Sequence, residues 1–419
     1  MVLALRSGSS TQAAMLLRCA YVVPISRPVV SDGVVELRGD RIAFVGPARA
    51  RTGEHVTDLG RVALLPGFVN AHTHLELTDH AGLMPPGPDF TAWLRRLLER
   101  RETHPPTAES IRRSTQQGIH QSLAAGVTTV GDITRYPEWT RPVLRESNLR
   151  AISFGEVLAL GRRRTLLSER LAAAASGEHA GPRLRIGVSP HSPYSVEPHA
   201  MRACAQQAEA LALPLAIHLL ETAEEEVFTR TGSGPFWTYL QHLGVWDDDV
   251  PLPGCGPLEL VHRTGLLRPS TLLAHANYAG AADIKLIAAS GTSVAWCPRT
   301  HAAFEHPPHP FRDMLRVGVN VAVGTDSLAS NPSLSVLDEL RFVYRTCDHV
   351  PPAECLRMGT LDGARALGWE HEIGSLEVGK QADLVAIPLD HDPDGDVCEA
   401  ILDGAASPVA VFVAGQRVA

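Results

Sequence analysis

Short apolar, β-prone runs alternate with stretches of helical periodicity from residue 64 to residue 368. This alternation predicts repeated βα units, because neighbouring parallel strands need a crossover helix between them. Eight such units close into a barrel, so we expect an α/β fold, a (β/α)8 TIM-type barrel over residues 64–368. The predicted strands are Leu64–Asn70, Val127–Ile133, Ala151–Glu156, Leu184–Ser189, Leu215–Leu219, Thr271–Ala276, Ser293–Cys297 and Asn320–Thr325. Predicted helices include Ser110–Ala125, Pro198–Leu211, Ala281–Ser290, Ser335–Thr346 and Pro352–Leu367.

Both ends of the chain instead carry short strands separated by turns. Residues 14–63 contain Gly39-Asp40, a strong hairpin signal between two β-prone runs. Residues 369–419 have the same texture, and neither segment is long enough to bury a core alone. We expect the two segments to form one small β-sandwich-like domain. Residues 1–13 lack a signal-peptide pattern and are expected to be a disordered extension.

His72 and His74 directly follow the first apolar run. Alternate residues of an extended segment point to the same face, so the two imidazoles are expected to lie side by side, as two ligands of one metal ion must. Two surface histidines are the alternative. The apolar run before them favours a buried strand end.

Titratable residues stand at several of the predicted strand ends. The carboxyl ends of the strands form the active-site face of a barrel of this kind. A single histidine there is more often a structural residue than a ligand, but several on one rim indicate a shared site. They are His72 with His74, His191, His218 with Glu221, His275, and Asp326.

A metal-dependent hydrolysis fits this set. Three imidazoles and one carboxylate, from His72, His74, His218 and Asp326, are expected to bind one divalent ion, Zn²⁺ or Fe²⁺, and to leave a position for water. Such an ion lowers the pKa of its water to about 7 and generates hydroxide at neutral pH.

Three residues take predicted catalytic roles. Asp326 accepts the proton of the water, and His275 orients the hydroxide. Glu221 is the general acid, which protonates a ring nitrogen and then the leaving amine. The alternative for Glu221 is a solvated charge at a helix start. The glutamates at 224–226 are assigned to the solvated face and to the helix N-terminus.

Composition excludes several classes of function. The net charge of −8 argues against nucleic acid or an anionic membrane as a partner. The seven cysteines are scattered without a C-x-x-C pair, so a reducing, cytoplasmic compartment is expected. No apolar run approaches the roughly 18 residues of a membrane span. The expected partners are a small heterocyclic substrate and water.

Five motifs together resemble the amidohydrolase superfamily, and in particular its mononuclear aminohydrolase branch. They are P-G-F-V-N-A-H-T-H, H-L-L-E, A-H-A, C-P-R and G-T-D-S, in this order, and the resemblance runs from Ala14 to Ala419. It implies a barrel with a companion β-domain, one zinc or iron ion, and usually the deamination of a heterocycle. Dimers are common in the family, so a homodimer is compatible with the resemblance.

The resemblance also bears on the number of metal ions. Binuclear members bridge two ions with a carboxylated lysine or a glutamate on strand 4. The only lysines here are Lys285 and Lys380, and neither lies near a predicted strand end. One ion is therefore expected.

Two motifs, H-T-H-L-E-L and S-P-H-S-P-Y-S-V, look most like aminodeoxyfutalosine deaminases of the menaquinone pathway. The resemblance gives His191 a substrate contact, and Glu76 is expected to read a ribose hydroxyl or a base edge. Futalosine-type substrates carry a benzoate, for which Arg135 and Arg299 are candidate partners. Trp93 is a candidate aromatic lid. The alternatives are a loop salt bridge for Glu76, structural ion pairs for the arginines and core packing for Trp93.

Other functions use the same site chemistry. A guanine or oxopurine deaminase, or a triazine chlorohydrolase, presents the same kind of ring carbon to the hydroxide. A catalytically silent scaffold is less favoured, because every expected ligand is present. His301, His306 and His309 are interpreted as loop residues, not ligands.

Overall fold

The computed structural model describes residues 14–419 apart from 52–55, 392 and 394. Its centre is a sheet of eight strands, β6 to β13, in which each strand pairs in parallel with the next along the chain. A parallel bridge returns β13 to β6, and the ring closes. The predicted (β/α)8 barrel is confirmed. The strands are β6 (Phe68–Thr73), β7 (Val127–Thr134), β8 (Arg150–Val157), β9 (Leu184–Pro190), β10 (Leu215–Leu219), β11 (Thr271–His275), β12 (Ser293–Trp296) and β13 (Val321–Val323).

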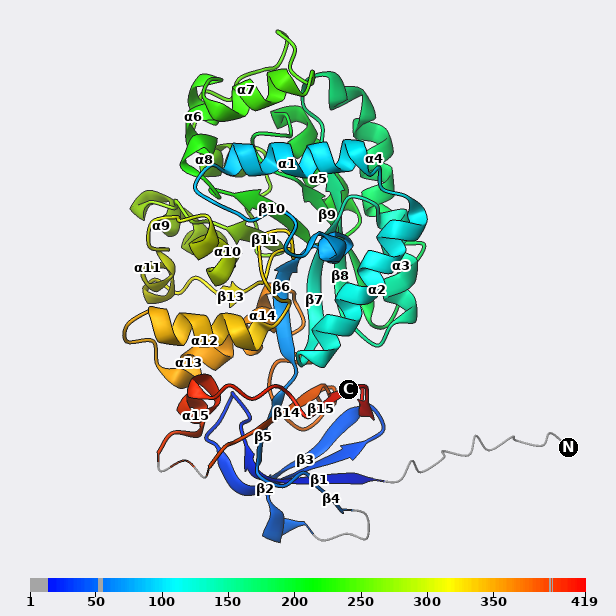
Figure 1. Ribbon diagram of the computed structural model, residues 1–419, viewed down its shortest axis with the longest axis vertical. Coiled ribbons are helices and arrows are strands. Elements are labelled where there is room, and N and C mark those ends of the chain that lie inside the picture. Colours follow the sequence, from blue (N-terminus) through cyan, green and yellow to red (C-terminus); the bar gives the residue numbers. More distant parts are fainter. Residues whose placement is uncertain (1–13, 52–55, 392, 394) are drawn as a thin grey trace, which may run out of the picture.

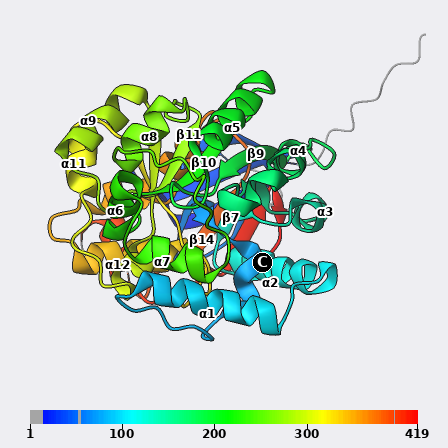
Figure 2. The same cartoon turned by 90° about the horizontal axis from the view of Figure 1, so that it is seen from above.

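Helices surround this ring, as Figure 1 and Figure 2 show. α1 lies on the rim at the carboxyl ends of the strands, beside α7. The helices are α1 (Phe90–Thr103), α2 (Ala108–Ala124), α3 (Pro137–Glu146), α4 (Leu167–Ala175), α5 (Pro198–Ala210), α6 (Ala223–Thr231), α7 (Pro235–His242), α8 (Pro257–Arg263), α9 (Ala281–Ser290), α10 (Pro298–Ala303), α11 (Phe311–Arg316), α12 (Val336–Thr346), α13 (Pro352–Met358) and α14 (Leu361–Ala366). Short 3₁₀ turns are η1 (Ala48–Ala50), η2 (Leu75–His80) and η3 (Gly161–Leu166).

The helix predicted over residues 352–367 is interrupted, and forms α13 and α14. Thr360 between them has φ −133° and ψ −93°, which is not helical. Gly359 packs against α12, where an added Cβ would lie 2.7 Å from a methyl of Leu340. Its carbonyl also accepts a hydrogen bond from the backbone N–H of Val69. These tertiary contacts, which helical periodicity does not encode, place the break.

The small β-domain is built from both chain ends, as predicted. Its strands form one sheet in the order β16-β15-β14-β5-β1-β2-β3, with β4 paired to β1. The predicted hairpin joins β2 to β3, and Gly39 adopts a positive φ of 62° in its turn. The strands are β1 (Met15–Val22), β2 (Val30–Arg38), β3 (Arg41–Pro47), β4 (Val56–Asp58), β5 (Val62–Pro66), β14 (Leu384–Pro388), β15 (Ala410–Val413) and β16 (Gln416–Arg417).

The strand predicted over residues 64–70 is two strands in different sheets. β5 pairs with β1 and β14 in the small domain, whereas β6 opens the barrel. Gly67 separates them, and an added Cβ there would lie 2.2 Å from the hydroxyl of Thr128. The predicted boundary between residues 63 and 64 therefore falls inside β5, and the sheets change at Gly67.

The C-terminal segment contributes to both parts. α15 (Val397–Asp403) packs against α12 and α13, so it covers the barrel and not the small sheet. Trp369 is buried beside the barrel strands, with the guanidiniums of Arg150 and Arg185 over its ring. The predicted extension, residues 1–13, lies outside the described residues.

The main apolar core lies between the barrel strands and their helices, and a second cluster joins other side chains of the same strands to Ala364, Leu367 and Trp369. A separate core lies within the small domain. A further cluster, rich in aromatic residues, lies under α1 and α7. Within the part of the chain that the structure describes, no helix is both long and apolar enough to cross a membrane.

Candidate active site

The structure brings the four predicted metal ligands together at the carboxyl end of the barrel. His74 Nε2 lies 3.2 Å from His218 Nε2. Asp326 Oδ1 lies 3.7 Å from His72 Nε2 and 3.6 Å from His74 Nε2. Ligands at about 2.1 Å from one tetrahedral ion are about 3.4 Å apart, so these donor atoms have the spacing of a zinc or iron site.

The protonation states of the clustered imidazoles also suit the binding of a cation. His218 Nδ1 lies 3.0 Å from the carbonyl oxygen of His191, so Nδ1 carries the proton and the lone pair of Nε2 faces the site. Burial lowers the pKa of His74 to about 4 and that of His218 well below its ordinary value. Among the described residues, neither ring nitrogen of the fully buried His72 has a hydrogen-bond partner. Neutral imidazoles with free lone pairs are what a divalent ion requires.

Non-glycine residues with left-handed backbone cluster at these strand ends. Leu220 follows β10 with φ 52°, His275 and Ala276 end β11 with φ 73° and 55°, and Asp326 follows β13 with φ 57°. Such residues are strained and persist only where surrounding contacts fix them. Asp326 is fixed by its N–H, which donates to the carbonyl of His72, and by its own carbonyl, which accepts from Thr73.

Glu221 lies opposite His275, with Oε1 3.5 Å from Nε2. The carboxyl group is buried, and burial raises its pKa well above the ordinary value, with the charges of Asp326 and Glu225 adding to the rise. Burial therefore favours the protonated form of Glu221, which is the form that a general acid needs. Burial pushes the pKa of Asp326 up as well, but the imidazoles of His74 and His72 outweigh it and keep that carboxyl ionised.

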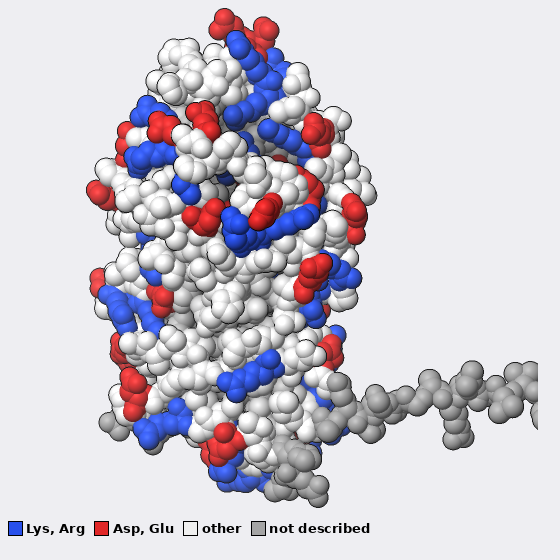
Figure 3. Space-filling model, turned by 45° about the vertical axis from the view of Figure 1, so that its right-hand side comes forward, with Lys and Arg blue, Asp and Glu red and all other residues white. Residues whose placement is uncertain are grey.

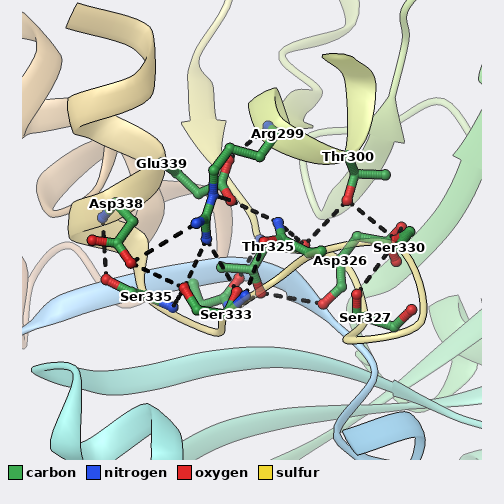
Figure 4. A network of polar contacts seen from close by, with 12 residues as sticks. Arg299, Thr300, Thr325, Asp326, Ser327, Ser330, Ser333, Ser335, Asp338 and Glu339 are labelled. Atoms are coloured by element: carbon green, nitrogen blue, oxygen red, sulfur yellow. Dashed lines mark hydrogen bonds and ion pairs between the residues drawn. The ribbon is translucent and has the colours of Figure 1, made fainter. Parts of the chain in front are cut away.

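Asp326 is also fixed from the side facing α12. Ser330 Oγ donates to Asp326 Oδ2 at 2.9 Å, within the network of Figure 4. Arg299 belongs to the same network, and its Nε donates to the buried Glu339 at 2.6 Å. Arg299 is not among the residues that line the cavity, and its guanidinium forms the structural ion pair that was the alternative to a substrate contact. The buried carboxylate of Glu339 needs the positive charge of Arg299, so this guanidinium is not free to bind a ligand.

A cavity extends from the four clustered ligands to the rim. It holds about 920 Å³ of space between atoms, part of it open to solvent. Apolar side chains of α1 and α7 form one wall. Trp93 is part of this wall and packs on Phe90 and Phe304, while its indole N–H donates to the carbonyl of Met84. The lid and core-packing interpretations of Trp93 are thus compatible.

Three arginines line the cavity from different elements: Arg101 of α1, Arg135 after β7 and Arg163 of η3. Burial first, and then the charge of Arg135, lowers the pKa of both Arg101 and Arg163, so the three charges lie in one neighbourhood. Figure 3 shows basic side chains around a hollow in the upper half of the molecule. Among the described residues, Arg135 and Arg163 have no ion-pair partner, whereas Arg101 faces Glu76 at 3.8 Å. We call these three residues the arginine cluster.

Glu76 does not continue the strand, because η2 begins at Leu75. Its carboxylate lines the cavity and accepts hydrogen bonds from Thr134 Oγ1 at 2.7 Å and from the backbone N–H of Arg135 at 3.0 Å. Glu76 thus holds one arginine by its backbone and faces another, Arg101, in an ion pair. Of the two interpretations of Glu76, the salt bridge describes this arrangement better than a free carboxylate that recognises the substrate base.

His191 and Glu156 stand together between the clustered ligands and the arginine cluster. His191 Nε2 lies 3.7 Å from Glu156 Oε1, and its Nδ1 lies 2.6 Å from Ser195 Oγ. Burial raises the pKa of Glu156, but His191 and then Arg135 outweigh it, so the carboxylate is ionised. Sequence reasoning missed Glu156, although a glutamate at the end of the third predicted strand was a usable signal.

Two other interpretations of the sequence need correction. Glu225 was assigned to the solvated face but is fully buried, and its carboxylate accepts hydrogen bonds from the backbone N–H groups of Leu220 and Glu221. His301 lies in the helix α10 and not in a loop, whereas His309 lies in a loop as predicted and is buried against Trp296. The arginines at 101 and 163 were missed, since only the folded rim brings α1 and η3 to the cavity.

Comparison with known proteins identifies the family of the chain. Residues 63–418 match the Amidohydrolase family. The chain belongs to the amidohydrolase family. A protein of Moorella thermoacetica named 5-methylthioadenosine/S-adenosylhomocysteine deaminase is 31% identical over 395 residues, which cover 90% of this chain and 86% of that protein. A protein of the same name from Desulforudis audaxviator is 31% identical and covers 88% of this chain and 84% of its own. This amidohydrolase is an enzyme that hydrolyses C–N bonds.

Solved structures share the fold along almost the whole chain. An adenosine deaminase from Xanthomonas campestris with bound zinc has a TM-score of 0.82 and 27% identity, and covers 96% of this amidohydrolase and 92% of itself. The aminofutalosine deaminase of Helicobacter pylori, in complex with methylthio-coformycin, has a TM-score of 0.85 and covers 97% and 100%. Its identity is 24%, so that likeness supports the fold alone.

Proposed function

We propose that this amidohydrolase is a metal-dependent deaminase of an adenine-type nucleoside, and that aminodeoxyfutalosine, on the futalosine route to menaquinone, is its substrate. The observation that carries the proposal is the single cavity that joins the histidine-rich site to the arginine cluster. The histidine-rich end of the cavity suits hydrolysis at a ring carbon, and the arginine cluster at the other end suits the binding of a substrate carboxylate. The names of the relatives support the adenine nucleoside.

His72, His74, His218 and Asp326 would bind one divalent ion, Zn²⁺ or Fe²⁺. The spacing of their donor atoms and the free nitrogens of His72 support this assignment. A bound divalent ion lowers the pKa of a water ligand to about 7 and so supplies the nucleophile.

The residues around the ion divide the proton transfers. Asp326 is ionised and accepts the proton of the attacking water at its carboxylate. His275 orients that water from the opposite side through Nε2, which has no partner among the described residues. Burial favours the protonated form of Glu221, which would donate its proton to a ring nitrogen, take up the proton of the newly added hydroxyl group and pass that proton to the leaving amine, while the proton held by Asp326 restores Glu221. Water is the second reactant and ammonia leaves, so atoms balance.

The remaining cavity residues would orient the nucleoside. His191 is held at Nδ1 by the hydroxyl group of Ser195, and its Nε2 would contact the sugar or the base. Trp93 and the apolar wall of α1 enclose the flat ring. Arg135 and Arg163, with Arg101 beside them, would pair with the benzoate of aminodeoxyfutalosine.

S-adenosylhomocysteine is a second candidate, which one observation favours. Its amino acid end carries an ammonium as well as a carboxylate, and the ionised Glu156 stands close enough to Arg135 for that positive charge to affect its pKa. Methylthioadenosine has no such charges, so it has no group that the arginine cluster could bind. The triazine and guanine alternatives likewise leave the arginines without a partner.

The test is release of ammonia by zinc-loaded and iron-loaded enzyme. The substrates are aminodeoxyfutalosine, S-adenosylhomocysteine, methylthioadenosine, adenosine, guanine and a chlorotriazine. We expect the highest kcat/KM for aminodeoxyfutalosine, with adenosine well below it. Turnover of none of the four adenine nucleosides would refute the deaminase, and a preference for methylthioadenosine would refute the role of the arginine cluster.

A further inference from the structure

Glu225 is a buried carboxylate next to the active site that the proposed reaction does not use. It is 0% exposed, although Glu224 and Glu226 beside it on α6 are partly or fully exposed. Its Oε1 accepts the backbone N–H of Leu220 at 3.0 Å, and its Oε2 accepts the N–H of Glu221 at 3.2 Å. Both carboxylate oxygens are thus committed to the peptide groups that carry the general acid.

The arrangement departs from an ordinary helix cap. Thr222 is the N-cap of α6 and Glu225 is its N3 residue, the spacing of a capping box, in which the glutamate returns to the N-cap N–H. Here the glutamate reaches past Thr222 to the two preceding residues. The backbone there needs support, because Leu220 has a positive φ of 52° without being glycine.

A second contact fixes the same residue from the opposite side. Asn277, which follows β11, is buried and donates through Nδ2 to the carbonyl of Glu221 at 3.0 Å. The backbone of Glu221 is therefore fixed at its N–H by Glu225 and at its carbonyl by Asn277. Its side chain needs such a fixed origin, because a general acid must come within hydrogen-bond reach of the atom that it protonates.

We propose that Glu225 is a positioning residue, whose carboxylate fixes the Leu220–Glu221 backbone and thereby aims the Glu221 carboxyl at the substrate. The proposal rests on the role of Glu221 in the proposed function. Burial raises the pKa of Glu225 to about 8, and the two N–H donors oppose that rise. A glutamine at this position would keep one acceptor oxygen and turn an NH₂ group toward the second N–H.

The first test compares Glu225→Gln with Glu226→Gln, a change at an exposed neighbour on the same helix whose one ion-pair partner among the described residues is Arg230. On whichever nucleoside the wild type deaminates, Glu225→Gln should lower kcat about 10- to 100-fold, with KM and metal per chain unchanged. Glu226→Gln should match the wild type. Loss of metal, a rise in KM parallel to the fall in kcat, or full activity in Glu225→Gln would overturn the positioning role.

The second test needs no turnover and so separates this proposal from the proposed function. Hydrogen–deuterium exchange is followed in the peptide that spans residues 219–226. Its two protected amides should exchange at least about tenfold faster in Glu225→Gln than in the wild type or Glu226→Gln. Unchanged exchange would overturn the proposal even in an enzyme without a known substrate. If Glu225→Gln does not fold, Glu225→Asp, which keeps the carboxyl group but shortens its reach, should show the same faster exchange and lower kcat.

Discussion

Replacement of Arg135 by glutamine should reduce the activity on a carboxylate-bearing nucleoside selectively. A hydrogen bond to a charged group contributes about 1.5–3 kcal/mol, and 1.4 kcal/mol is a factor of ten, so the full loss is about 10- to 100-fold in kcat/KM. Two features of the structure move the expectation to the lower end. Arg163 also lines the cavity without an ion pair among the described residues, and the half-buried rim admits solvent. We expect about a tenfold loss.

The assay compares kcat/KM for aminodeoxyfutalosine and adenosine in the wild type, Arg135→Gln and Arg162→Gln. Arg162 is the control, because it is an exposed neighbour of Arg163 that does not line the cavity. Adenosine has no charge for the guanidinium to meet, so its kcat/KM should change less than about twofold in Arg135→Gln. Added salt should weaken the wild-type preference for the carboxylate substrate.

An equal loss on both nucleosides would refute the reasoning, since it would mean that Arg135 supports the fold of the cavity and not the anion. Glu76 makes that outcome a real alternative, because its carboxylate also accepts the backbone N–H of Arg135. A glutamine keeps this backbone contact. A selective loss in Arg135→Gln can therefore be assigned to the side chain.

Other expected outcomes concern the metal and acid stability. Glu221→Gln should abolish turnover and keep the metal, whereas His72→Ala should lose both; metal analysis of the purified proteins checks this, and an apo Glu221→Gln would contradict its role. The metal-free protein should lose about 1 kcal/mol of unfolding free energy for each of His301, His306 and His309 between about pH 7.5 and about pH 5.5. Burial lowers their pKa values to about 4, 4 and 3, so the unfolded chain takes up protons first, near 6.5, and stability falls as pH falls. Denaturant midpoints at the two pH values measure this, and equal midpoints would contradict it.

The barrel strands could be predicted because each is an apolar run with a clear end. The end of the first run was misplaced for a physical reason. Gly67 reads as part of a continuous strand, but it is the point where the chain leaves one sheet for another, and Thr128 of the neighbouring strand β7 approaches it so closely that no side chain fits there. A contact between residues this far apart leaves no local pattern in the sequence.

The residues at the rim of the barrel could be predicted where they directly follow a strand. His72, His74, His218 and Asp326 follow strand ends directly, so the closure of the barrel is enough to gather them. Arg163 is different, because it reaches the cavity only through the conformation of η3. The spacing of residues along the chain does not encode such a conformation.

Glu225 shows the limit most clearly. A run of three glutamates at a helix start has the composition of a solvated face, and its two outer members are indeed partly or fully exposed. The middle one is buried because the strained turn at Leu220 presents two N–H groups to it.

The charges of the cavity impose an orientation on its ligand. Burial favours the protonated form of Glu221 at the ion-binding end, and the arginine cluster lies farther along the cavity, where Glu76 and Glu156 also line the wall. An adenine nucleoside with a distal anion matches both ends of the cavity in one orientation only. In that orientation its amino-bearing carbon faces the histidines and its anion faces the arginines. The reverse direction would bring the anion to the ionised Asp326 and leave the arginines unpaired. On the proposed function, the arginine cluster would select against inverted binding as well as in favour of the anion.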